Sequence, residues 1–224
     1  MRLLPACLLG LLLPVLHLLG QEAAPKEGQP EEDAPEIIEF SAQRMSGSMK
    51  EGQDYTRLSG GAKIKTASME IEADVIELYG EDFRFIKAEG AVRGVQEEDG
   101  LTFSCGIMEY DREEKIAVFS ENVVLDDREN EVVAKAQRIE YREEAAVALM
   151  QVEVELTQED SVSTCAFALY RKDEKFLEMT GNPQVVQGDD TFRAQEILLN
   201  LDTDEITLIG RVQGTVTEET EEED

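Results

Sequence analysis

Apolar and polar residues alternate one by one along most of the chain after residue 36. The segment 69–75 reads Met-Glu-Ile-Glu-Ala-Asp-Val, and 152–156 reads Val-Glu-Val-Glu-Leu. A period of two residues is typical of β-strands that bury one face and expose the other. Short polar stretches between the alternating segments predict tight turns. The segment 131–144 is charged enough to leave a helix open there; the rest predicts an all-β fold.

The alternating segments recur with a period of about thirty residues. Similar short segments begin at Gly60, Gly90, Glu121, Met150, Gly181 and Gly210. Later in each unit comes a tyrosine or asparagine followed by a polar turn: Tyr79, Tyr110, Tyr141, Tyr170 and Asn200. One such unit cannot bury its apolar face alone, whereas stacked units share one interior. The pattern therefore predicts stacked repeats of two or three short strands each.

The inward positions of these rungs are predicted to form one continuous apolar groove. Its lining residues are expected to be Ile64, Ile71, Phe85, Val92, Phe103, Ile116, Val123, Val147, Val154, Phe176, Val185, Phe192 and Ile206, with Leu125, Val152, Leu208 and Val212 on the same face. A bulge that shifts the alternation by one residue would move a side chain to the other face. A closed, dry core is built from the same residue types, so that alternative stays open.

The tyrosine column is expected to be structural, each ring packed on the sheet edge with its hydroxyl exposed. Cys105 and Cys165 occupy equivalent places in the second and fourth units. Because a whole unit lies between them, their Cα atoms should be farther apart than the ~7 Å that a disulfide permits. The sequence predicts two buried free thiols.

The chain divides into four parts by composition. Residues 1–20 begin with Arg2 and continue as an almost unbroken apolar run, which predicts a signal peptide or, if uncleaved, an N-terminal anchor. Residues 21–35 are rich in Glu, Pro, Gly and Ala and predict a disordered linker. Residues 36–217 form the folded domain, and 218–224 are an acidic tail.

The charge and the residue composition exclude several classes of function. His17 is the only histidine and lies in the predicted signal peptide, which excludes histidine-based catalysis and histidine metal sites from the mature chain. A formal net charge of −29 argues against nucleic acid as a partner. Acidic runs such as Asp126-Asp127 and Asp189-Asp190 lack the spacing of a calcium loop and predict solvated turns. No metal, cofactor or catalytic residue is predicted.

The fifth unit carries a family resemblance. It reads Gly181-Asn182-Pro183-Gln184-Val185-Val186-Gln187-Gly188-Asp189-Asp190-Thr191-Phe192-Arg193-Ala194, and the elements 89–92 and 110–111 repeat weaker parts of the same pattern. Over about residues 37–216 the chain resembles the OstA-like N-terminal domain shared by LptA, LptC and the periplasmic part of LptD. The resemblance implies a V-shaped open β-jellyroll. It also implies a groove that holds acyl chains of lipopolysaccharide, in a periplasmic bridge from inner to outer membrane.

The resemblance further implies partners: lipopolysaccharide or another glycolipid or phospholipid, and LptC-like and LptD-like proteins or further copies of this chain, stacked edge to edge. The strong negative charge repels anions, so the groove is expected to contact acyl chains mainly, and a less anionic lipid is a hypothesis. One alternative is a protein-bridging scaffold without lipid. A glycosidase-like enzyme is disfavoured by the short chain and short loops. The role of soluble bridge and that of inner-membrane clamp both stay open.

Overall fold

The computed structural model describes residues 37–48, 50, 54–67, 69–96, 100–129, 131–203 and 205–217. The predicted signal peptide, linker and acidic tail lie outside these residues. The described part contains strands and one short 3-10 turn, η1 (Glu81–Phe83). The strands are β1 (Glu39–Ser41), β2 (Arg44–Ser48), β3 (Tyr55–Lys65), β4 (Met69–Tyr79), β5 (Phe85–Gln96), β6 (Leu101–Asp111), β7 (Ile116–Asp127), β8 (Val132–Arg142), β9 (Val147–Gln158), β10 (Ser161–Arg171), β11 (Phe176–Thr180), β12 (Gln184–Gln187), β13 (Asp190–Arg193), β14 (Glu196–Asn200), β15 (Ile206–Ile209) and β16 (Gln213–Thr215).

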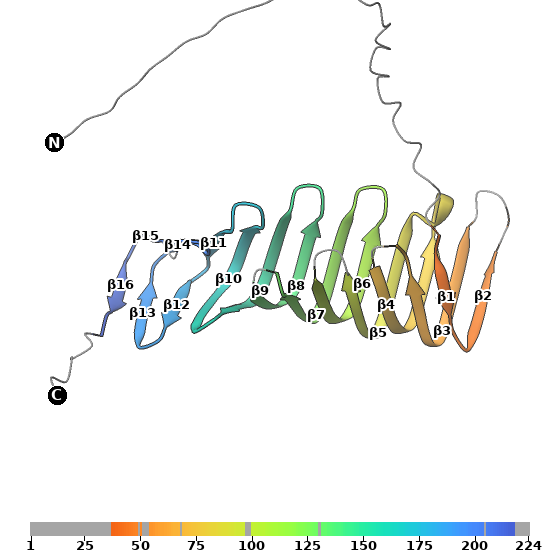
Figure 1. Ribbon diagram of the computed structural model, residues 1–224, viewed down its shortest axis with the longest axis horizontal. Helices are drawn as coiled ribbons and strands as arrows, with labels where there is room; N and C mark the ends of the chain where they lie inside the picture. Colours follow the sequence, from red (N-terminus) through yellow and green to blue (C-terminus); the bar gives the residue numbers. More distant parts are fainter. Residues whose placement is uncertain are drawn as a thin grey trace, which may run out of the picture. The chain divides into compact units, whose positions relative to one another are not determined.

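The strands follow one another as an antiparallel meander. From β3 to β11 each strand pairs with the next along the chain, and β14 and β15 continue the series. The strands consequently lie side by side in chain order along the long axis of the domain (Figure 1). The segment that left a helix open forms β8. The predicted all-β fold with an open jellyroll sheet is confirmed.

Each long odd-numbered strand is bent near its middle by one extra residue. The register shifts there between Ser59 and Ala62, for example, and equivalent shifts interrupt β5, β7 and β9. The two residues at each bend both have positive φ: Gly60-Gly61, Gly90-Ala91, Glu121-Asn122, Val152-Glu153, Gly181-Asn182 and Gly210-Arg211. An extra residue in a strand bends it and increases its twist. The recurring segments found in the sequence are these bends.

The bends divide the sheet into two leaves. The first leaf consists of β2, β11, β14 and β15 together with one half of each long strand. This half is the one that lies next to the turns after Tyr79, Tyr110, Tyr141 and Tyr170. The second leaf holds the other halves, together with β1, β12, β13 and β16. At β10 the division is complete, because β11 pairs with residues 167–171 and β12 with residues 161–164.

Apolar side chains from every rung pack between the two leaves. Leu58, Ile76, Ile139 and Leu177 have no exposed surface, and buried residues alternate with exposed ones along each strand. These residues form a single core cluster that extends from β3 to β14. The interior of the domain is therefore continuous along its length and well packed.

The turns are held by their own side chains. Asp111 Oδ1 accepts hydrogen bonds from the backbone N–H groups of Glu113 and Glu114 at 3.1 and 3.2 Å. Asn200 Oδ1 accepts them in the same way from Asp202 and Thr203. An Asp or Asn before a polar turn can stabilise it locally. The turns after Tyr110 and Asn200 therefore have a structural explanation, and within the described residues no group of acidic side chains is arranged to hold a metal ion.

Candidate functional site

Most of the residues predicted to line the groove face the interior. The fully buried members are Ile64, Ile71, Val92, Phe103, Val123, Val154 and Val185, and Leu125 joins them. Phe192, Ile206 and Leu208 are partly buried and pack against the same core. The alternation in the sequence thus identified the inner face for both leaves.

Four predicted lining residues lie on the opposite face, and their assignment was wrong. Phe85, Ile116, Val147 and Phe176 are each the first residue of their strand, and the next residue is the buried one. The residues that take the inner places are Ile86, Ala117, Ala148 and Leu177. In each of these strands the inward residue comes one position later than the sequence pattern suggested, and a shift of one residue exchanges the faces.

Contacts on the outer face explain why two of these aromatic residues are tolerated there. Phe85 stacks on Tyr79 with ring centroids 5.3 Å apart, and the guanidinium of Arg84 lies 5.0 Å from its centroid. The guanidinium of Arg171 lies 5.7 Å from the centroid of Phe176. Arginine over an aromatic face is a favourable contact that also shields the ring from water.

Two further residues were assigned wrongly, one because of a bend and one because of its place at the end of the stack. Val152 and Val212, predicted to face inward, are 52% and 54% exposed. Val152 is one of the two positive-φ residues in β9, where the extra residue interrupts the alternation, so its side chain does not continue either face. Val212 directly follows the equivalent pair, a place at which Val92, Val123 and Val154 are buried. Its exposure therefore reflects its place at the last rung, beside β16, which within the described residues pairs with β13 alone.

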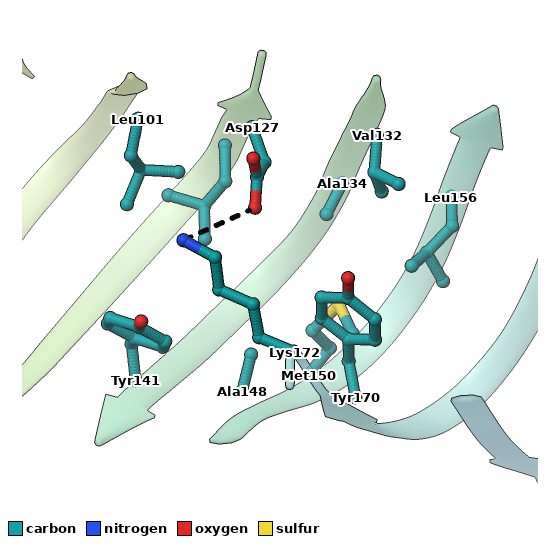
Figure 2. Close-up of a pocket in the computed structure, with 11 residues that line it drawn as sticks. Leu101, Asp127, Val132, Ala134, Tyr141, Ala148, Met150, Leu156, Tyr170 and Lys172 are labelled. Atoms are coloured by element: carbon teal, nitrogen blue, oxygen red, sulfur yellow. Dashed lines mark ion pairs between the residues drawn. The ribbon is translucent and has the colours of Figure 1, made fainter. Parts of the chain in front are cut away.

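A small cavity lies between the leaves around β6–β10. It has a volume of about 40 Å³ and is lined by apolar side chains of both leaves (Figure 2). In the first leaf Ala148 pairs with Tyr141 on one side and with Tyr170 on the other. The short alanine between two large rings leaves the space. The cavity is far too small for an acyl chain with the leaves in this position.

Polar groups meet this cavity at two places. The Tyr170 side chain is 7% exposed, and its hydroxyl has no hydrogen-bond partner among the described residues. Burial raises the pKa of Tyr170 to about 12. Lys172 Nζ lies 3.9 Å from Asp127 Oδ2 and 3.9 Å from Glu129 Oε2, and it thereby connects the turn after β10 with the far end of β7 (Figure 2).

Both ends of the interior are uncovered. At the N-terminal end Phe40 and Met45 pair with the buried residues Ile64 and Leu58, yet they are 50% and 46% exposed because no further rung among the described residues covers them. At the C-terminal end a depression of about 200 Å³ is lined by both apolar and acidic residues: Val185, Phe192, Leu199, Leu201 and Ile206, and Glu159, Asp160 and Asp202. The interior therefore meets solvent at the first and last rungs.

The prediction of buried free thiols is confirmed. Cys105 and Cys165 are both buried and unpaired. Burial raises the pKa of each thiol to about 11, which keeps it protonated and unreactive at neutral pH. They contribute to the core.

Sequence reasoning missed the polar groups at the cavity. Tyr170 was expected to expose its hydroxyl, which is wrong, and Asp127 was assigned to a solvated turn although it is buried. Lys172 was not singled out. One available signal is a basic residue at the same place in two units: Lys172 stands two residues after Tyr170, and Arg112 stands two residues after Tyr110. That regularity alone does not show that the side chain reaches the other leaf.

Among the described residues no helix has the length and apolar character needed to cross a membrane. Apart from the cavity, the interior between the leaves is filled with apolar side chains. The arrangement defines a class of protein: an open antiparallel β-stack with an apolar interior and two uncovered ends.

The comparison with protein families names the class more closely. Residues 107–205 match the family described as LptA/(LptD N-terminal domain) LPS transport protein. This segment runs from the middle of β6 to the turn before β15, and its match agrees with the resemblance to the OstA-like domain seen in the sequence. The family consists of transport proteins, which agrees with the expectation that the chain is not an enzyme.

No curated protein sequence matches the chain. One similar solved structure is LptH from Pseudomonas aeruginosa, described as the LptA homologous periplasmic component of the conserved lipopolysaccharide transport device. The two sequences are 9% identical, and the match covers 81% of this chain and 96% of that chain with a TM-score of 0.24. The fold described above rests on the strand pairing of this chain and not on that likeness.

Proposed function

We propose that the domain shields acyl chains of lipopolysaccharide, or of a related glycolipid or phospholipid, between its two leaves. In this proposal it works in the periplasm as part of a bridge between inner and outer membranes. The observation that carries the proposal is the apolar interior, which extends from β3 to β14 and is left uncovered at both ends. The match of residues 107–205 to a lipopolysaccharide-transport family supports the choice of cargo.

The energetics are compatible with lipid uptake only if the leaves separate. Each methylene transferred from water to an apolar interior gains about 0.8 kcal/mol. The interior has a free volume of only about 40 Å³ near its centre, so a chain must displace contacts between the leaves. The two leaves are joined covalently at the bends, which allows them to part without loss of strand pairing within either leaf.

The end strands supply the bridging part of the proposal. Within the described residues, β1 and β2 each pair only with β3, while β15 pairs only with β14 and β16 only with β13. A strand paired on one side is a template for another sheet. LptC-like or LptD-like domains, or further copies of this chain, are the proposed partners because their rungs would continue the same interior.

Site-specific photocrosslinking tests the lipid contact. A photoreactive amino acid replaces Phe103 or Phe192 on the inner face, and Phe176 on the outer face serves as the matched control. The protein is expressed with its own N-terminus in a Gram-negative host, irradiated and analysed for covalently attached lipid. We expect adducts from the inner positions and none from Phe176. Equal labelling of all three positions would refute a defined inner site.

A protein-bridging scaffold without lipid is the second candidate, and the packed interior favours it. Native mass spectrometry separates the two, because a shielding protein retains lipid and a scaffold does not. A scaffold would also assemble end to end as its concentration rises, with its interior empty. Sedimentation velocity of the same sample measures that assembly.

A further inference from the structure

The Tyr170 hydroxyl is a buried polar group without a hydrogen-bond partner among the described residues. The neighbouring lining residues of the cavity, such as Leu156, Met150 and Val132, are apolar (Figure 2). A buried hydroxyl without a hydrogen bond is unfavourable, and phenylalanine would fill the same space without that cost. A ligand oxygen that accepts from this hydroxyl would remove the penalty.

Ion pairs between Lys172 and the carboxylates of Asp127 and Glu129 lie at the opening of the cavity. Lys172 extends from the first leaf, and Asp127 and Glu129 belong to the end of β7 and its turn in the second leaf. The side chains of Lys172 and Asp127 are only 17% and 12% exposed, so this pair is less screened by water than the surface pairs of the domain. It lies where the free margins of the two leaves meet, opposite the bends.

We propose that Lys172 and the carboxylates of Asp127 and Glu129 form a latch between the leaves, and that its opening admits a single acyl chain bearing a hydrogen-bonding oxygen, which Tyr170 binds. The inference rests on the proposed lipid-shielding function and adds a lateral entry and a polar contact to it. The chain takes the space beside Ala148, and its hydroxyl, ester or carboxyl oxygen accepts from Tyr170 Oη. Released from its partners, Lys172 then lies beside the polar end of the ligand.

Lys172→Met tests the latch, because methionine keeps most of the side-chain volume and removes the charge. Lys175→Met is the matched control: Lys175 is in the same turn and pairs at 3.0 Å with Asp202, but it does not line the cavity. Uptake of the fluorescent fatty acid cis-parinaric acid is followed by stopped flow. We expect Lys172→Met to raise the association rate constant about two- to fivefold, as loss of an ion pair of this kind implies. Added salt should accelerate the wild type and leave the variant unchanged.

Tyr170→Phe tests the polar contact with a matched pair of competitors, 1-decanol and decane. Displacement of cis-parinaric acid by decanol should weaken about fivefold in the variant, as loss of one hydrogen bond implies, while displacement by decane should be unchanged. If the wild type takes up no cis-parinaric acid, the proposed function fails. If the wild type binds it but Lys172→Met behaves like Lys175→Met and Tyr170→Phe loses nothing for decanol, only the latch and the polar contact are refuted.

Discussion

Replacement of Tyr170 by phenylalanine should make the unliganded domain more stable. Most core substitutions destabilise a protein, so the sign of the effect is diagnostic. The hydroxyl is the only atom removed, and the ring keeps its place beside Ala148 and Met150. Because the hydroxyl has no partner among the described residues, its removal breaks no hydrogen bond there.

The size of the effect follows from two opposing terms. A buried polar group without a hydrogen bond costs about 1–3 kcal/mol. Removal of the oxygen enlarges a cavity of about 40 Å³ slightly, and at ~24 cal/mol per Å³ this enlargement costs a few tenths of a kcal/mol. The net gain in the free energy of unfolding should be about 1–2 kcal/mol, which for a domain of this size raises Tm by roughly 2–8 °C.

Urea unfolding at neutral pH, followed by circular dichroism, measures the change. Tyr55→Phe is the control, because the Tyr55 hydroxyl donates to Glu77 Oε1 at 3.0 Å on the surface. The control should be neutral or destabilised by less than about 1 kcal/mol. The m-value should be unchanged in both variants, since neither alters the surface exposed on unfolding.

Loss of stability in Tyr170→Phe would refute the reasoning. A decrease of about 1 kcal/mol or more would mean that the hydroxyl has a partner in solution, because removal of a satisfied hydrogen bond produces a loss of that size. The proposed role of Tyr170 as a binding group for a ligand oxygen would then lose its structural basis.

The bends, the thiols and one arginine give three further predictions. Val152 and Gly90 both have positive φ, which glycine adopts with the least strain. In urea unfolding, Val152→Gly should therefore stabilise the domain by about 1 kcal/mol, and Gly90→Ala should destabilise it by about 1–2 kcal/mol. Equal effects would contradict the assignment of the bends. Burial raises the pKa of Cys105 and Cys165 from 9.0 to about 11, so the stability that the protonated thiols provide is complete below pH 9 and is lost as the pH rises to 11. A variant with alanine at both positions should show a flatter fall of Tm over that interval, and an unchanged profile would contradict the shifts. Arg84 holds the pKa of the Asp111 carboxyl below its usual range. Arg84→Gln should therefore lower Tm at neutral pH and leave Tm unchanged once the pH is low enough to protonate Asp111.

The sequence predicted the fold well because its main signal is local. Alternation with a period of two identifies strands and the face of each residue, as Ile64, Ile71 and Val92 show. The segments that begin at Gly60 and Gly90 were recognised as repeats, but their role as bends was not predicted. Two consecutive positive φ values are favoured by glycine, but Val152 and Glu153 occupy the same geometry without it.

The candidate site could not be predicted because it depends on contacts between leaves. Lys172 and Asp127 lie in different units, and only the bending of the strands brings them within 3.9 Å. The four residues assigned to the wrong face show a second limit. The turn length decides whether Ile116 or Ala117 faces inward, and both are apolar, so hydrophobicity alone does not distinguish them.

Under the proposed function, the packed interior implies that lipid uptake would open only part of the domain. A chain of twelve methylenes gains at most about 10 kcal/mol from burial. A domain of ordinary size is stable by only about 5–15 kcal/mol in total. Separation of the leaves over the whole length from β3 to β14 would expose the entire core cluster, which the gain from one chain cannot offset. Opening confined to β7–β10, where the cavity and the Lys172 pair already interrupt the packing, exposes far less apolar surface. Lipid passage by such a domain would therefore proceed by local openings that move from rung to rung, with the rest of the interior closed.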